Sequence, residues 1–210
     1  GGATKYYVYR YTYDANRAQM NVVQNLLGTT TSTSYTDSTG TPGVTYYYYV
    51  RSYADSSAHY SIPSECDTGF RKKVPVSLAI SGDSSVAAGG TIAYAASVTY
   101  NDNSSRSVTP TWSITSGSSY GTISASGVFA ANGTTTQRDV TIAASYTEAG
   151  ETVSKTKAIT ITTVEVTITF DANGGIVSPA SKVYTAYAAY DSFPSATRVG
   201  YTFAGWFTRA

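Results

Sequence analysis

The chain has 210 residues, among them 18 glycines and 20 tyrosines, and its 14 basic and 13 acidic residues leave a net charge of +1. Charges this balanced and scattered provide neither the basic stripe that binds nucleic acid nor an acidic tail. One cysteine and one histidine exclude an internal disulfide and leave too few ligands for a zinc site. We therefore expect no metal, no cofactor and no nucleic-acid partner.

The local patterns point to several small β units. Short apolar runs alternate with polar residues and are separated by glycine, serine and threonine, as in β-sandwiches. Residues 15–27 have some helical character, but β-branched residues and asparagines weaken it, so we interpret them as a loop leading into a strand. No apolar run reaches the roughly 20 residues that span a membrane. The expected fold class is all-β: tandem β-sandwiches followed by a small β-grasp-like unit.

The first unit is expected at residues 1–72, with strands near residues 5–10, 33–37 and 44–52. In the last of these, Val50 and Arg51 set the alternation, so Tyr46, Tyr48 and Val50 should face the core. The order of the strands resembles a fibronectin type III domain from its third strand onward. The resemblance implies that the first two strands lie before Gly1 or come from another molecule. Without them the inward face is expected to be partly wet, with an unpaired edge at residues 33–36.

The opposite face of this unit carries the candidate site. If Tyr6 and Val8 face inward, the outward side chains of the two neighbouring strands are tyrosines. Cross-strand aromatic pairs stabilise a sheet by roughly 0.2–1 kcal/mol each, so a structural ladder is one explanation. Packing against another protein subunit and stacking on glycans are the alternatives. The candidate ligand or assembly surface consists of Tyr7, Tyr9, Tyr11, Tyr47, Tyr49 and Tyr53.

The second unit is expected at residues 73–163. Its short strands recur at intervals of about 8–15 residues with glycine and asparagine between them. The segments Gly90-Thr91-Ile92, Pro110-Thr111-Trp112-Ser113 and Gly121-Thr122-Ile123-Ser124 are similar, in this order, to a bacterial immunoglobulin-like group 2 domain. The resemblance implies that Trp112 is the central core residue.

The third unit is expected at residues 164–210. Val166, Ile168 and Phe170 alternate with threonines, and Asn173-Gly174 provides the two positive φ angles of a type I′ turn before a second strand. This segment, followed by 197-Thr-Arg-Val-Gly-Tyr-Thr-Phe-Ala-Gly-Trp-Phe-Thr-208, resembles the Listeria–Bacteroides repeat, a β-grasp-like module found in tandem on bacterial surface proteins. The resemblance implies a C-terminally incomplete repeat with Phe170, Phe203 and Trp206 in its core.

The sequence offers no convincing catalytic group. His59 lies in a polar stretch without a nucleophile elbow, and the carboxylates occur singly. Cys66 has no basic neighbour in sequence and is expected to be a buried structural thiol. Abundant small β units without a catalytic motif predict a non-enzymatic segment.

Taken with the resemblances, these patterns predict a segment of a secreted or surface-attached bacterial protein. Its expected role is adhesion, extension or assembly of an extracellular fibre or layer. Its expected partners are other protein subunits or neighbouring domains, joined by strand addition in a head-to-tail order. The alternative is a spacer or carbohydrate-binding module of a secreted polysaccharide-degrading enzyme, with glycans as the partner.

Overall fold

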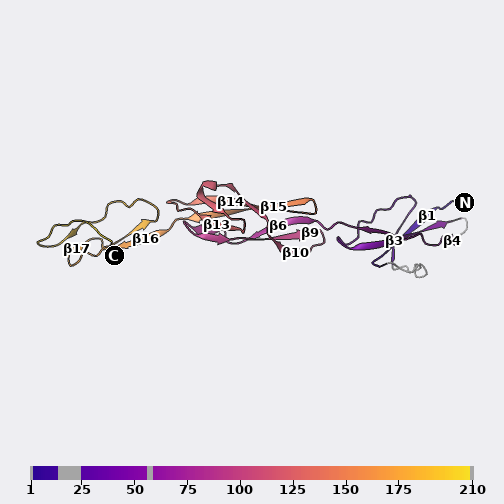
Figure 1. Ribbon diagram of the computed structural model, residues 1–210, viewed down its shortest axis with the longest axis horizontal. Helices are drawn as coiled ribbons and strands as arrows, with labels where there is room; N and C mark the ends of the chain where they lie inside the picture. Colours follow the sequence, from indigo (N-terminus) through magenta and orange to yellow (C-terminus); the bar gives the residue numbers. More distant parts are fainter. Residues whose placement is uncertain (1, 14–24, 56–58, 209–210) are drawn as a thin grey trace. The chain divides into compact units, whose positions relative to one another are not determined.

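The computed structural model describes residues 2–13, 25–55 and 59–208, and these residues form strands, turns and almost no helix (Figure 1). The expected all-β class is confirmed. The chain divides into two compact units, residues 1–76 with 100–104, and residues 77–99 with 105–210. The boundaries expected at residues 72/73 and 163/164 stay predictions.

The first unit is built on one antiparallel sheet. Its strands are β1 (Lys5–Tyr11), β2 (Leu26–Thr30), β3 (Thr45–Ala54), β4 (His59–Tyr60) and β5 (Asp67–Phe70). The order is β2-β1-β3-β4, and β5 pairs with the other end of β3. β3 is the longest of these strands, and it is long enough to pair with two short strands. Its C-terminal end pairs with β4, and its N-terminal end pairs with β5. Of residues 15–27, only 25–27 lie within the described part, and β2 begins there.

The register of β1 and β3 decides which side chains share a face. Tyr9 lies opposite Tyr49, and Val8 lies opposite Val50. Side chains alternate between faces along a strand, so the expected tyrosine ladder does form on one side of the sheet. It is also a core, because Tyr9, Tyr11 and Tyr49 are buried and pack with Leu26.

The burial expected for the opposite face holds only in part. Tyr46 is buried, Tyr48 is half-buried, and Val50 is 36% exposed. The expectation that Val50 is a core residue is therefore wrong. The expectation that Tyr9, Tyr11 and Tyr49 face solvent is wrong as well. The physical reason is that large aromatic rings on adjacent strands bury one another edge to face, as Tyr11 and Tyr49 do with ring centroids 5.8 Å apart.

Most of the second unit is a stack of sheets whose strands are antiparallel except for one pair. Three orders occur: β10-β9-β6, β11-β14-β15-β7 and β12-β13-β8. The strands are β6 (Pro75–Ser81), β7 (Ser85–Ala87), β8 (Thr91–Ala93), β9 (Ala95–Tyr100), β10 (Ser105–Val108), β11 (Thr111–Ser116), β12 (Gly121–Ile123), β13 (Val128–Ala131), β14 (Arg138–Glu148) and β15 (Glu151–Thr162), with a 3₁₀ turn, η3, at Ser118–Tyr120. β7 pairs with β15 in parallel, at Ser85–Ala87 and Thr160–Thr162.

The core of this stack is mostly aliphatic, with Phe129 and Tyr94 as its buried aromatic residues. Phe129, Ile142 and Ile161 are fully buried and belong to one cluster with Val140 and Ile159. Trp112 is only half-buried and packs against the cluster from outside, with its ring 6.3 Å from that of Tyr94. The expectation that Trp112 is the central core residue is therefore wrong. Phe129 occupies that place.

The rest of the second unit, from residue 164, contains two short antiparallel pairs. β16 (Glu165–Thr169) pairs with β18 (Ser181–Thr185), and β17 (Ile176–Val177) pairs with β19 (Ala196–Thr197). Asn173 and Gly174 have positive φ angles, so the expected turn is confirmed. The strand after this turn, however, pairs with β19 and not with β16.

Aromatic rings form the core of this C-terminal part. Phe170 is buried between Trp206 and Phe193, at centroid distances of 5.0 and 5.6 Å. Trp206 is half-buried, and its indole N–H donates to the Pro194 carbonyl at 2.6 Å. Phe203 is 40% exposed, so the expectation that it is a core residue is wrong.

Candidate functional site

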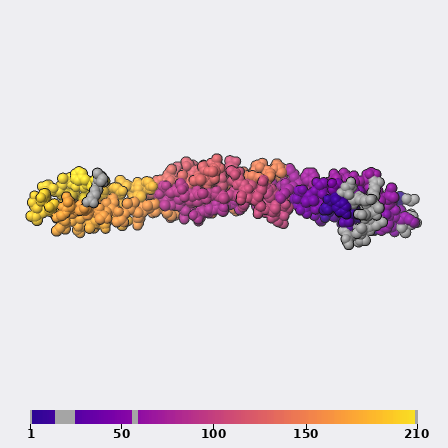
Figure 2. All heavy atoms as spheres, turned by 60° about the horizontal axis from the view of Figure 1, so that its bottom comes forward, coloured from indigo at the N-terminus to yellow at the C-terminus, as the bar shows by residue number. Residues whose placement is uncertain are grey.

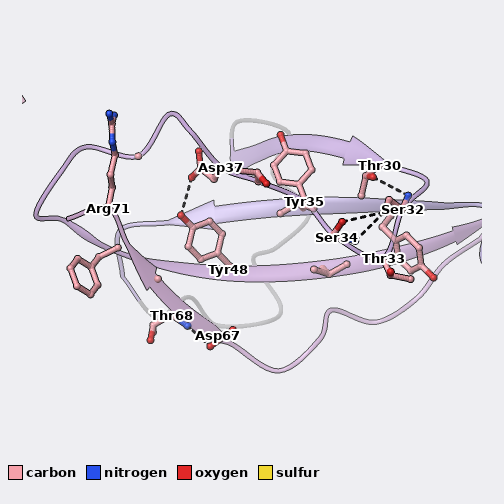
Figure 3. A pocket seen from close by; sticks show the side chains of 17 residues that line it. Thr30, Ser32, Thr33, Ser34, Tyr35, Asp37, Tyr48, Asp67, Thr68 and Arg71 are labelled. Atoms are coloured by element: carbon pink, nitrogen blue, oxygen red, sulfur yellow. Dashed lines mark hydrogen bonds between the residues drawn. The ribbon is translucent and has the colours of Figure 1, made fainter. Parts of the chain in front are cut away.

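A groove of about 810 Å³ lies on the Val8 face of the first sheet. Its floor is the apolar stripe of Tyr6 and Val8 from β1 and of Tyr48 and Val50 from β3. One wall is the segment 30–37, which follows β2, and the far end is formed by residues 67–71 (Figure 3). The floor is apolar because it is the face that the alternation of β1 and β3 assigns to the core. The expected partly wet inward face is this groove.

One carboxylate fixes the wall to the floor. Asp37 accepts hydrogen bonds from the Arg10 guanidinium at 2.8 Å and from the Tyr48 hydroxyl at 2.9 Å (Figure 3 shows the second). It also accepts two from Thr39, through its backbone N–H and its hydroxyl, each at 2.8 Å. The Asp37 side chain is 8% exposed. The alternation had placed Arg10 on the inward face, and Asp37 is the counter-charge that makes this position tolerable.

These contacts shift the pKa values of the Asp37 carboxyl and of the Tyr48 hydroxyl. Burial alone would raise the pKa of Asp37, but the hydrogen bonds from Thr39, Arg10 and Tyr48 outweigh it and hold the pKa well below its ordinary value. Burial and the hydrogen bond to the Asp37 carboxylate raise the pKa of Tyr48 to about 12. At neutral pH the wall therefore carries a carboxylate that is neutralised by Arg10.

The wall itself has no assigned secondary structure. Residues 34–39 belong to no β-ladder within the described part of the chain. Among the same residues, the backbone groups of residues 35–37 make no hydrogen bond, and Tyr35 reaches back through its hydroxyl to the Leu27 carbonyl at 3.4 Å. Thr36 and its neighbours thus carry N–H and C=O groups that no other described residue pairs, beside an apolar floor. The strand expected near residues 33–37 is not formed, so that expectation is wrong, and the backbone expected to be an unpaired edge at residues 33–36 lies outside every ladder of the described residues.

The tyrosine surface expected from the sequence is divided by the fold. Tyr9, Tyr11 and Tyr49 are inside, and Tyr47 is half-buried against them. Tyr7 also packs against this cluster and is half-buried, as is Tyr53, and both lie at the end of the sheet near β4. A binding role for the six tyrosines stays a prediction.

A third ring, Tyr60, joins Tyr7 and Tyr53. Its centroid lies 5.0 Å from that of Tyr7 and 4.9 Å from that of Tyr53, and the ring is 45% exposed. The Arg51 guanidinium carbon lies 5.0 Å from the Tyr60 centroid. Tyr60 follows His59 in the stretch that the sequence patterns indicated to be polar, and it was not among the candidate residues. Tyr60 belongs to β4, and a strand of two residues is too short to show the alternation of apolar and polar residues that would indicate it in the sequence.

Other chemistry finds little support in the described residues. They contain no group of three or more His, Cys, Asp and Glu side chains that could hold a metal ion. None of the helices found among them could cross a membrane. Cys66 is exposed, so the expectation of a buried thiol is wrong. It precedes β5, outside the ladder that would have buried it.

The comparison with known families concerns the C-terminal part. Residues 167–210 match the Listeria–Bacteroides repeat domain. No curated protein sequence matches the chain. The resemblances of the earlier residues to fibronectin type III and bacterial immunoglobulin-like domains stay predictions. The matched repeat is typical of bacterial surface and extracellular proteins, which supports a surface location.

Proposed function

We propose that this chain is a non-catalytic segment of a secreted or surface-attached bacterial protein that acts in adhesion, extension or assembly of an extracellular fibre or layer. The observation that carries the proposal is the match of residues 167–210 to a repeat of bacterial surface proteins. The separate hydrophobic cores of the chain support it, because independent small β modules are suited to tandem arrays. The single histidine and single cysteine support the non-catalytic part.

Antibodies raised against residues 1–210 are expected to label intact cells of the source bacterium or to detect the protein in its culture medium. Protease treatment of intact cells should remove the cell-bound signal. A cytoplasmic protein from the same cells is the control, since it should resist the protease until lysis. Labelling that appears only after lysis would contradict the proposed location.

A carbohydrate-binding role is the second candidate, and the cluster of Tyr7, Tyr53 and Tyr60 favours it. The exposed Tyr60 ring, two half-buried rings beside it and the Arg51 cation provide the stacking surface and the polar contact that sugars use. On a glycan array, binding through this cluster is expected to disappear in a Tyr53→Ser, Tyr60→Ser variant. An Ile62→Ser variant is the control, because Ile62 is 82% exposed and lies outside the cluster. Unchanged binding by the double variant would refute this candidate.

A further inference from the structure

The groove in the first unit has the form of a site for an added β-strand. Its wall at residues 34–39 has no assigned secondary structure, and six residues would span about 20 Å in an extended conformation at the usual rise of roughly 3.3 Å per residue. Three of these residues have backbone groups that no described residue satisfies. An unpaired main chain beside an apolar floor is what β-strand addition requires, since backbone bonds provide affinity and alternate side chains fill the floor.

The same chain contains a segment with the complementary properties. Residues 201–208, in the yellow region of Figure 2, belong to no ladder of the described residues. Within those residues, the backbone groups of residues 202–208 make no hydrogen bond. Tyr201, Phe203 and Phe207 are 69%, 40% and 84% exposed. They stand at alternate positions with Gly205 between them, so they can all point to one side of an added strand.

The segment is also anchored and uncharged. Trp206 packs on Phe170 at a centroid distance of 5.0 Å and on Phe203 at 5.3 Å, which holds the segment in place and leaves Tyr201 and Phe207 the most exposed of its aromatic side chains. Gly205 has a φ of 128°, which allows the backbone to bend where Trp206 turns inward. No acidic or basic residue lies between Arg198 and Arg209, so this stretch carries no charge at neutral pH. A neutral strand suits this groove, because its most buried carboxylate, Asp37, is already neutralised by Arg10.

We propose that residues 201–208 of one copy of this chain add as a strand to residues 34–39 of a second copy, and that Tyr201, Phe203 and Phe207 cover the groove floor at Val8, Tyr48 and Val50. This inference deepens the assembly role in the proposed function and rests on it. The contact joins two different surfaces of one molecule, so each copy keeps a free groove at one site and a free segment at the other. Such heterologous contacts build open chains and not closed dimers.

Cross-linking between two single-cysteine proteins tests the pairing. Both carry Cys66→Ser, one carries Val50→Cys in the floor, and the other carries Phe207→Cys in the segment. Mixing them under mild oxidation is expected to give a disulfide-linked heterodimer. The matched control replaces Phe207→Cys with Ile176→Cys, since Ile176 is 74% exposed in the same unit but outside the segment. Equal cross-linking of the control pair would overturn the proposal.

Sedimentation velocity over a range of concentrations gives the second test. The unmodified chain is expected to form a ladder of oligomers, and Phe207→Lys should weaken this association more than about tenfold, since buried aromatic anchors dominate interfaces. Ile176→Lys should leave it unchanged. Association that survives Phe207→Lys, or a chain that stays monomeric at every concentration, would refute the strand addition. So would a Val50→Cys, Phe207→Cys chain that cross-links only within itself.

The two proposals fail in different ways. A chain that is found on intact cells but does not cross-link through Val50 and Phe207 would leave the surface role standing and remove the strand addition. A glycan that binds in the groove and protects the Val50→Cys thiol from alkylation, without oligomers, would show a different occupant and would also overturn it. Circular dichroism of each variant checks that its β-structure is retained.

Discussion

Phe129→Ala is expected to destabilise the sheet stack of the second unit by about 3–5 kcal/mol, the usual cost of emptying a buried aromatic site. Phe129 is fully buried at the centre of the cluster formed with Ile142 and Ile161. Its ring also packs against the backbone of Gly121, where an added Cβ would lie 2.6 Å from the Phe129 Cζ atom. The surrounding β-ladders limit how far the structure can collapse into the cavity.

Urea denaturation followed by hydrogen exchange of the β13 and β14 amides measures this loss in the right part of the chain. The matched control is Val128→Ala, because Val128 is the preceding residue of β13 and is 38% exposed. That change should cost less than about 1 kcal/mol, since it removes little buried surface. Equal effects of the two substitutions would mean that the stack has no core at Phe129.

Asp37→Asn is expected to destabilise the first unit by about 2–3 kcal/mol, in the range of hydrogen bonds to charged groups. The substitution removes the charge that Arg10, Thr39 and Tyr48 contact and leaves the Arg10 cation partly buried without a counter-charge. Thermal unfolding of the variant at pH 7 measures the loss. Asp55→Asn is the control, because Asp55 is exposed and lies outside this network.

The same hydrogen bonds to Asp37 make the stability of the first unit depend on pH. The pKa of Asp37 is lower in the folded chain than its ordinary value of about 3.9 in an unfolded chain. The ionised Asp37 therefore contributes fully to the stability of the fold above about pH 5. This contribution is lost as the pH falls through about 3.9 towards the pKa of Asp37 in the folded chain. Melting temperatures between pH 7 and pH 2 should decline less steeply for Asp37→Asn than for the unmodified chain. Parallel declines would show that Asp37 is not the responsible group.

The alternation in the first unit was readable from the sequence, but the choice of core face was not. Val50 and Arg51 correctly predicted that Tyr47 and Tyr49 share a face, and the register with β1 bears this out. Alternation cannot tell which of two faces is covered when both carry tyrosine. That depends on what packs over each face, and here the rings of Tyr9, Tyr11 and Tyr49 cover one another.

Contacts between residues that are distant in the sequence also could not be predicted from it. The Asn173-Gly174 turn was predictable because two adjacent residues determine it. The pairing of β16 with β18 was not, because the choice of partner depends on an aromatic core gathered from Phe170, Phe193 and Trp206. In the same way, nothing near Arg10 in sequence indicated that Asp37 would neutralise it.

The parallel pairing of β7 with β15 has a consequence for the way in which the sheet stack resists a pulling force. One strand lies near the beginning of the sheet stack and the other at its end, joined at Ser85–Ala87 and Thr160–Thr162. The Ala88 N–H and the Thr160 N–H extend this ladder at both ends. Tension on the chain pulls parallel strands past each other, so their hydrogen bonds resist in shear and must break together. The hydrogen bonds of a hairpin that is pulled apart at its open end would instead break one after another.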